Sequence, residues 1–139
     1  MFKANKISQC KIIDLGKTHQ LKGNITVIEN FKDIQFNINR VYYLYDVPGG
    51  VSRGGHAHKA LFQLIVAASG SFDVEIFDGI KRQKYHLNQP NLGLFIVTGI
   101  WRVLDNFSSG SICLVLASDV YLAEDYIRDY DLFLNLKNN

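Results

Sequence analysis

Two histidines separated by one residue are the first group in this sequence that could carry out chemistry. His56 and His58 lie in the stretch RGGHAHKALFQL, residues 53–64, directly after an arginine and two glycines. Imidazole can bind a metal ion, and it can also give and take protons near neutral pH without one. The stretch by itself leaves both kinds of chemistry open.

Strand geometry predicts how these side chains are positioned. Alternate residues of a strand point to the same face, so His56 and His58 should project from one wall of a sheet, with Ala57 on the other face. The same spacing places Arg40 and Tyr42 on one face of their own strand. We expect the two polar faces to line a common interior, because polar groups are costly to bury without a function. The simpler interpretation is that each is a boundary residue with satisfied hydrogen bonds.

Short strands are the elements that must hold these side chains. Segments rich in β-branched and aromatic residues alternate with Gly, Pro, Asn, Asp and Ser, which is the pattern of an antiparallel sandwich or barrel. Asp78 and Gly79 fall between two such segments and predict a tight hairpin turn. Tyr126, Tyr130 and Phe133 have the spacing of a short amphipathic helix near the end of the chain. The predicted strands cover residues 40–45, 61–67, 71–77, 81–87, 92–97 and 111–117.

Composition limits the class of protein. The chain has 139 residues, of which 47% are hydrophobic, and this length predicts one domain covering residues 1–139. A net charge of +2 without a basic cluster argues against nucleic acid or a membrane surface as partner. No apolar run is long enough for a signal peptide or a spanning helix, so we expect a cytoplasmic protein. Cys10 and Cys113 are then expected to be reduced thiols.

The region around the histidines resembles the first motif of the cupin fold, an all-β jelly roll. That motif contains a glycine, an HxH pair, a glutamate and a second glycine at fixed spacing, and the corresponding positions here are Gly50, His56, His58, Gln63 and Gly70. The second cupin motif aligns with VTGIWRVLDN, residues 97–106. The resemblance implies a cupin (jelly-roll) antiparallel β-barrel with a short C-terminal helical segment.

Two substitutions separate this chain from the metal-binding cupins, whose metal is held by three histidines and the glutamate. Gln63 replaces the glutamate, and Arg102 replaces the last histidine. An amide is not an anionic ligand, and a guanidinium stays protonated and brings a positive charge to the place of the metal. We therefore predict a site without metal. Trp101, the neighbour of Arg102, should point the other way and contribute to packing.

A narrower resemblance extends from about residue 11 to residue 135. The sugar 3,4-ketoisomerases that act on dTDP-4-keto-6-deoxyglucose contain, in the same order, segments similar to GNITVIEN, RVYYLYDVPGGVSRGGHAHKALFQL, GSFDVEIFDG, GIWR, NFSSGSICLVLAS and DYIRDYD. The resemblance implies a homodimer without cofactor that forms a dTDP-3-keto-6-deoxyhexose through an enediol, on the way to 3-amino-3,6-dideoxyhexoses of surface glycans. The N-terminal segment KISQCKIIDL could pair across the subunits of such a dimer.

The resemblance also assigns roles to the residues of the expected interior. His56 transfers the proton between C3 and C4 of the sugar, and His58 orients the sugar or shares in the proton transfer. Tyr42 relays a proton between O3 and O4, because a phenol both donates and accepts. Arginines bind the diphosphate, since the planar guanidinium forms paired hydrogen bonds with phosphate oxygens. The expected substrate-binding residues are Arg40, Arg53, Arg102, Lys59 and Gln63.

Two other classes of function fit parts of the pattern. In a metal-dependent cupin, such as a dioxygenase or a metal isomerase, Gln63 and a water would complete the ligands around the histidines. In a non-catalytic dTDP-sugar binder, the cavity would hold the nucleotide without turnover. Arg102 argues against the first class, and the histidine pair together with Tyr42 argues against the second. Each arginine, considered alone, could equally form a surface ion pair.

Overall fold

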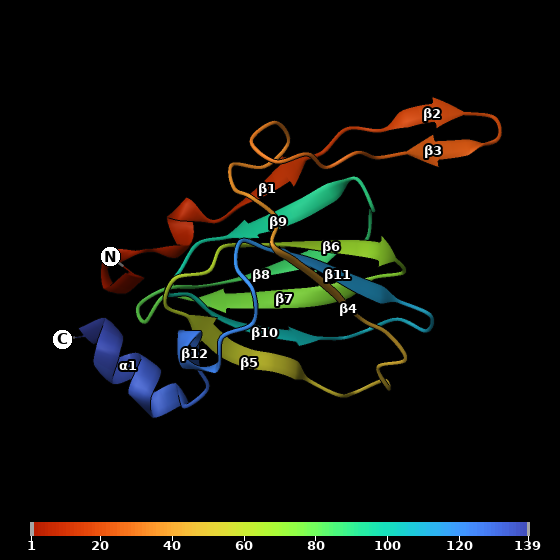
Figure 1. Ribbon diagram of the computed structural model, residues 1–139. Helices are drawn as coiled ribbons and strands as arrows, with labels where there is room; N and C mark the ends of the chain where they lie inside the picture. Colours follow the sequence, from red (N-terminus) through yellow and green to blue (C-terminus); the bar gives the residue numbers. More distant parts are fainter. Residues whose placement is uncertain (1, 139) are drawn as a thin grey trace.

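Two antiparallel sheets lie face to face in the computed structural model, which describes residues 2–138 (Figure 1). The first sheet has the order β1-β9-β6-β11-β4, and the second has the order β12-β5-β10-β7-β8. A separate hairpin, β2-β3, projects away from the two sheets (Figure 1). The strands are β1 (Lys11–Asp14), β2 (Thr18–Gln20), β3 (Gly23–Ile25), β4 (Arg40–Leu44), β5 (Arg53–His58), β6 (Gln63–Ser69), β7 (Phe72–Phe77), β8 (Arg82–Leu87), β9 (Leu92–Ile96), β10 (Trp101–Asp105), β11 (Ile112–Ala117) and β12 (Tyr126–Ile127).

All six strands predicted from the sequence are present, and their ends differ from the predicted ends by at most two residues. The predicted hairpin at Asp78 and Gly79 is confirmed, because it joins β7 to β8. The Asp78 carboxylate accepts hydrogen bonds from the backbone N–H groups of Ile80, Lys81 and Ile7, so it also ties the N-terminal segment to this turn. Short 3-10 helices, η1 (Phe2–Ala4) and η2 (Ile7–Gln9), form that segment.

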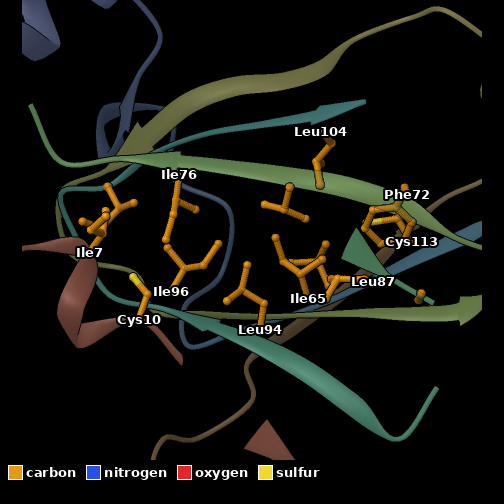
Figure 2. Close-up of a cluster of buried hydrophobic side chains, with 14 of the residues drawn as sticks. Ile7, Cys10, Ile65, Phe72, Ile76, Leu87, Leu94, Ile96, Leu104 and Cys113 are labelled. Carbon is orange, nitrogen blue, oxygen red and sulfur yellow. The ribbon is translucent and has the colours of Figure 1, made fainter. Parts of the chain in front are cut away.

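Apolar side chains fill the space between the two sheets (Figure 2). Ile65 and Leu94 of the first sheet belong to the same buried cluster as Ile76 and Leu104 of the second. Strand alternation selects these residues, since their sequence neighbours point to the outer faces. The cluster holds the sheets at a fixed separation and so fixes the width of the interior next to it.

Both outer faces of the sheets are covered as well. Ile34 and Phe36, in the connection before β4, pack on Leu64 of the first sheet. The C-terminal helix α1 (Tyr130–Asn138) covers the second sheet, where Phe133 packs with Trp101. Each central strand is therefore buried on two sides, which makes its position resistant to change.

The C-terminal segment differs from the predicted helix at its beginning. Phe133 lies on a helix as predicted, but α1 begins only at Tyr130 and is preceded by η3 (Ala123–Asp125) and β12. The helical assignment of Tyr126 was therefore wrong, because Tyr126 belongs to β12 and pairs with His58 of β5. The edge of β5 supplies backbone hydrogen-bond partners, and burial of Ile127 adds to their effect, so tertiary contacts override the local helical pattern.

The two cysteines are buried free thiols, as the sequence predicts. Burial raises the pKa of Cys10 to about 11 and that of Cys113 to about 12. Both thiols are thus protonated at neutral pH and contribute packing rather than nucleophilic chemistry. Within residues 2–138, no helix is both long enough and apolar enough to cross a membrane.

Candidate active site

A β-bulge in β5 explains the first of the two glycines that precede the histidines. In the pairing of β5 with β10, His56 is opposite Arg102. Arg53 is opposite Leu104, so β5 has one more residue than β10 between the two pairs. Gly54 adopts a φ of 74°, and a Cβ atom there would lie 3.4 Å from Nη1 of Arg102. The bulge therefore turns Arg53 and His56 toward the same interior, and glycine allows the guanidinium to approach the backbone.

His56 and His58 contact each other inside the barrel, on the same face as their spacing predicts. Their Nε2 atoms are 3.0 Å apart, and the residues are only 6% and 3% exposed. Ala57 points to the opposite side and is buried in the cluster beneath α1. On the other edge of the His58 ring, Nδ1 lies 2.8 Å from Oδ2 of Asp125.

Arg102 is a buried cation next to the histidine pair. It is 2% exposed, its Nη2 donates a hydrogen bond to the Tyr42 hydroxyl at 2.9 Å, and the same nitrogen lies 3.2 Å from Nε2 of His56. The Nε and Nη1 groups have no hydrogen-bond partner. A buried charge with unpaired donors is unfavourable, so this guanidinium is suited to an anionic group of a ligand.

His56, Arg102 and Tyr42 meet in a cavity of about 440 Å³ between β4 of the first sheet and β5 and β10 of the second, whereas His58 lies behind His56 and is not among the residues that line it. Among the described residues that line it, four are arginines and none is acidic. The cavity thus has the charge that a phosphate ester or an enediolate requires. Its lining comprises Arg40, Tyr42, Leu44, Arg53, Gly54, Gly55, His56, Arg102, Leu104, Tyr126 and Arg128.

The face of β4 that lines the cavity is the one that the alternation predicts. Arg40 and Tyr42 line the cavity, whereas Val41 and Tyr43 are exposed on the other side of the strand. The Arg40 guanidinium lies 5.3 Å from the centre of the Tyr42 ring, and its Nη2 donates a hydrogen bond to the Tyr126 hydroxyl at 3.2 Å. Arg40 therefore joins the predicted part of the site to the C-terminal segment.

Tyr126, Arg128 and Asp125 belong to the site but are not among the residues predicted from the sequence. Tyr126 and Arg128 line the cavity, and the Arg128 guanidinium lies 4.2 Å from the centre of the Tyr126 ring. The signal that could have identified them is the alternation of polar residues around buried Ile127, which is typical of a strand. The helical spacing of the aromatic residues that follow obscured it.

Three other residues for which the sequence predicts a role do not line the cavity. Trp101 is buried against Tyr130 and Phe133, so its predicted packing role is confirmed. Lys59 is exposed and Gln63 is 2% exposed, and neither is among the residues that line the cavity. The Oε1 atom of Gln63 is buried without a hydrogen-bond partner. Substrate contacts by Lys59 and Gln63 stay predictions.

Burial keeps both imidazoles neutral. Loss of solvent, followed by the charge of Arg102, lowers the pKa of His56 to about 2. Burial and then Arg102 also lower the pKa of His58, to about 4, although the Asp125 carboxylate opposes the shift. A neutral imidazole has one free lone pair, which is the form in which a histidine can act as a general base.

The side chains in the cavity do not fit a cupin metal. The Arg102 guanidinium lies 3.2 Å from Nε2 of His56, which places a permanent positive charge beside the nitrogen that would bind the cation. Within residues 2–138, no group of three or more His, Cys, Asp or Glu side chains is arranged to hold a metal ion. The geometry is that of an acid–base site.

Comparison with known proteins identifies the family. The chain matches the family described as "FdtA: WxcM-like, C-terminal" over residues 8–138 and belongs to it. It is 42% identical over 123 residues to a TDP-4-oxo-6-deoxy-alpha-D-glucose-3,4-oxoisomerase of Aneurinibacillus thermoaerophilus, and the match covers 88% of each chain.

Solved structures agree with this assignment. A 3,4-ketoisomerase from Helicobacter canadensis is 43% identical, with a TM-score of 0.92 over 94% of this chain and 98% of that one. A mutant 3,4-ketoisomerase from Thermoanaerobacterium thermosaccharolyticum, in complex with TDP-4-keto-6-deoxyglucose, is 35% identical, with a TM-score of 0.89 over 91% of each chain. The predicted cupin fold and the predicted resemblance to the sugar 3,4-ketoisomerases are both confirmed.

The buried histidines predict that stability depends on pH. In the unfolded chain their pKa lies near 6.5, whereas burial lowers it to about 2 for His56 and about 4 for His58. Below pH 6.5 the unfolded state therefore binds more protons, and the free energy of unfolding should fall as the pH decreases from 6.5 toward 4. Urea unfolding at a series of pH values measures this slope. It should be shallower in the double variant His56→Gln, His58→Gln, and an identical slope in both proteins would contradict the prediction.

Proposed function

We propose that this protein is a dTDP-sugar 3,4-ketoisomerase that converts dTDP-4-keto-6-deoxy-D-glucose to a dTDP-3-keto-6-deoxyhexose without metal or cofactor. Residues 1–139 act as one domain, in the cytoplasm, in the synthesis of 3-amino-3,6-dideoxyhexoses for surface glycans. The observation that carries the proposal is the line of contacts from His58 through His56 and Arg102 to Tyr42 along the cavity. The relative with 42% identity is named for the same reaction.

The reaction moves a ketone by one carbon, and the site contains the groups that this requires. His56 removes the proton from C3, which is acidic because the ketone is adjacent, and an enediolate forms. The Arg102 guanidinium, which is 2% exposed and has two nitrogens without a hydrogen-bond partner, stabilises the negative oxygen. Transfer of a proton between O3 and O4, followed by return of a proton to C4, gives the 3-keto sugar.

Tyr42 is placed to carry the proton between the two oxygens. Its hydroxyl oxygen accepts a hydrogen bond from Nη2 of Arg102 at 2.9 Å, which leaves the phenolic hydrogen free to be donated. The contact also places the phenol beside the guanidinium that faces the enediolate. The relay therefore acts on the oxygen whose charge Arg102 stabilises.

The remaining arginines bind the diphosphate of the nucleotide. Arg40, Arg53 and Arg128 line the same cavity as Arg102, and Arg53 and Arg128 are exposed. Guanidinium groups retain their charge and bind phosphate oxygens through paired hydrogen bonds. The sugar then lies at the buried histidines and the nucleotide extends toward the open side. A relative that is 35% identical has been solved in complex with TDP-4-keto-6-deoxyglucose.

Exchange with deuterium tests the reaction directly. Incubated with dTDP-4-keto-6-deoxyglucose in deuterated water, the protein should exchange the C3 proton and move the ketone, as followed by NMR of the sugar protons. In the His56→Asn variant turnover should fall by roughly 10²–10⁴-fold, because the base is missing, while TDP affinity is retained. Tight TDP-sugar binding by the wild-type protein without exchange would instead indicate a non-catalytic binder.

The variant Tyr42→Phe separates the proton relay from binding. It removes only the phenolic oxygen, so kcat should fall by about 10²-fold, while KM changes little. Steady-state kinetics with the same sugar measure both constants. The variant Tyr43→Phe, on the exposed face of β4, serves as the matched control and should behave as wild type. Equal kcat values for Tyr42→Phe and wild type would dismiss the relay.

We also propose that the protein is a homodimer with contacts through its N-terminal part. The strand β1 lies at the edge of the first sheet, and the β2-β3 hairpin projects from the body (Figure 1). Leu21, Ile25 and Val27 in and beside this hairpin are exposed. An unpaired edge and exposed apolar residues favour association with a second copy.

Sedimentation equilibrium tests the dimer. The expected mass is about twice the 15.8 kDa of one chain. The double variant Ile25→Lys, Val27→Lys should shift the protein toward the monomer, because it places charges on the apolar surface of the hairpin. A wild-type protein that sediments as a monomer at micromolar concentration would rule out the homodimer.

A further inference from the structure

Aromatic side chains hold Arg40 at the wall of the cavity. Its guanidinium carbon lies 5.3 Å from the centre of the Tyr42 ring and 5.5 Å from the centre of the Tyr121 ring. Its Nη2 atom donates a hydrogen bond to the Tyr126 hydroxyl at 3.2 Å. Aromatic rings at such distances attract a guanidinium through the negative charge of their faces. Three tyrosines therefore restrain one arginine.

The arginines of the cavity are held without carboxylates. Within residues 2–138, none of the four that line the cavity forms an ion pair with an acidic side chain, whereas Arg82, outside it, pairs with Glu75 at 3.2 Å. A carboxylate would neutralise the charge and occupy the N–H groups, but a ring contacts the flat face and leaves the N–H groups at the edge free. The Nε atom of Arg40 is buried without a hydrogen-bond partner among the described residues. The position of Arg40 is thus restrained while its charge stays available to an anion.

Tyr121 contributes to this arrangement from outside the cavity. The residue is 56% exposed and is not part of the cavity lining. Its ring lies beside the Arg40 guanidinium and also contacts the Tyr126 ring, with 5.4 Å between the ring centres. Tyr126 in turn contacts Arg128, whose guanidinium lies 4.2 Å from the centre of its ring. Tyr121 therefore supports the two arginines that lie on this side of the cavity, the first by direct contact.

Hydrogen bonds hold the segment that carries Tyr121 in place. At its start, Nδ2 of Asn39 donates a hydrogen bond to the backbone carbonyl of Ser118 at 2.8 Å. At its end, the Asp125 carboxylate accepts a hydrogen bond from a backbone N–H between β5 and β6 at 2.7 Å. Asn39 directly precedes Arg40 in the chain, so the first of these bonds fixes the segment relative to the arginine. The fold itself therefore places the Tyr121 ring beside the guanidinium.

We propose that Tyr121 is a positioning residue for phosphate recognition: its ring holds the Arg40 guanidinium in the orientation that binds the diphosphate of the nucleotide. The inference rests on the proposed binding of a dTDP-sugar and extends it to a residue outside the cavity. An unrestrained arginine side chain has many rotamers, and this freedom is lost when it binds a phosphate. Restraint by Tyr121 before the ligand binds lowers that entropic cost and so raises the affinity.

The variant Tyr121→Leu removes the ring and keeps an apolar side chain. Titration calorimetry should show a TDP affinity about two- to fivefold lower than that of the wild type, as for the loss of a partly exposed cation–π contact. With the keto sugar, KM should rise by a similar factor while kcat is unchanged, because Tyr121 lies outside the cavity. Tyr121→Phe retains the ring and should bind TDP as the wild type does.

A double-mutant cycle separates this role from direct contact between Tyr121 and the ligand. In the Arg40→Gln background, where three arginines of the cavity remain, Tyr121→Leu should cause no further loss of TDP affinity. An equal loss in both backgrounds would overturn the inference and would indicate that the exposed ring stacks on the base of the nucleotide.

Tyr43→Leu is the matched control for Tyr121→Leu. Tyr43 is exposed to a similar degree, 58%, on the outer face of β4, and its ring contacts Tyr45. This variant loses an exposed tyrosine ring that does not contact an arginine of the cavity, so its TDP affinity should equal that of the wild type. A loss as large as that of Tyr121→Leu would contradict a specific role of Tyr121.

Failure of the proposed function gives a different result from failure of this inference. Wild-type protein that binds TDP but does not turn over the keto sugar would contradict the ketoisomerase, and the comparison of TDP affinities would still decide the role of Tyr121. Unchanged TDP affinity in Tyr121→Leu, with an active wild type, would contradict the positioning role alone. A wild-type protein without measurable TDP affinity would overturn both.

Discussion

The buried positive charge of Arg102 is the interaction on which the rest of the site depends. Its guanidinium contacts a phenol and an imidazole, two of its nitrogens have no hydrogen-bond partner, and it is 2% exposed. Such a charge opposes protonation of the neighbouring histidines and favours an anion in the cavity. The fold therefore holds a buried charge that a negatively charged ligand or intermediate would neutralise.

The architecture supports this charge from several directions. Apolar clusters lie between the sheets and on both outer faces, so β10 is held on two sides and the guanidinium cannot easily turn to solvent. The bulge at Gly54 brings the backbone of β5 to the guanidinium and turns Arg53 into the cavity. Asp125, on the far side of the histidines, supplies the negative charge that the cavity itself lacks. The fold thus places the positive charge of Arg102 on one side of the imidazole pair and the negative charge of Asp125 on the other.

Much of the fold and part of the site follow from local patterns. Residues of one strand face share a period of two, so the common orientations of His56 with His58 and of Arg40 with Tyr42 could be predicted. The position of Tyr126 could not, because its aromatic neighbours have helical spacing, and only the free edge of β5 makes it a strand residue. The contact of Asp125 with His58 depends on the same pairing, which joins segments far apart in the chain.

By itself, the sequence determined the class of elements, the faces of the main strands and the replacement of a metal ligand by Arg102. These properties depend on residue type and on the short-range geometry of a strand. Only the tertiary structure decided which polar side chains contact each other. The contacts between His58 and Asp125 and between Arg102 and Tyr42 require several strands to pair in one register. The register of the strands is set by the burial of whole sheet faces. The free energy gained from this burial comes from many residues that are distant in sequence.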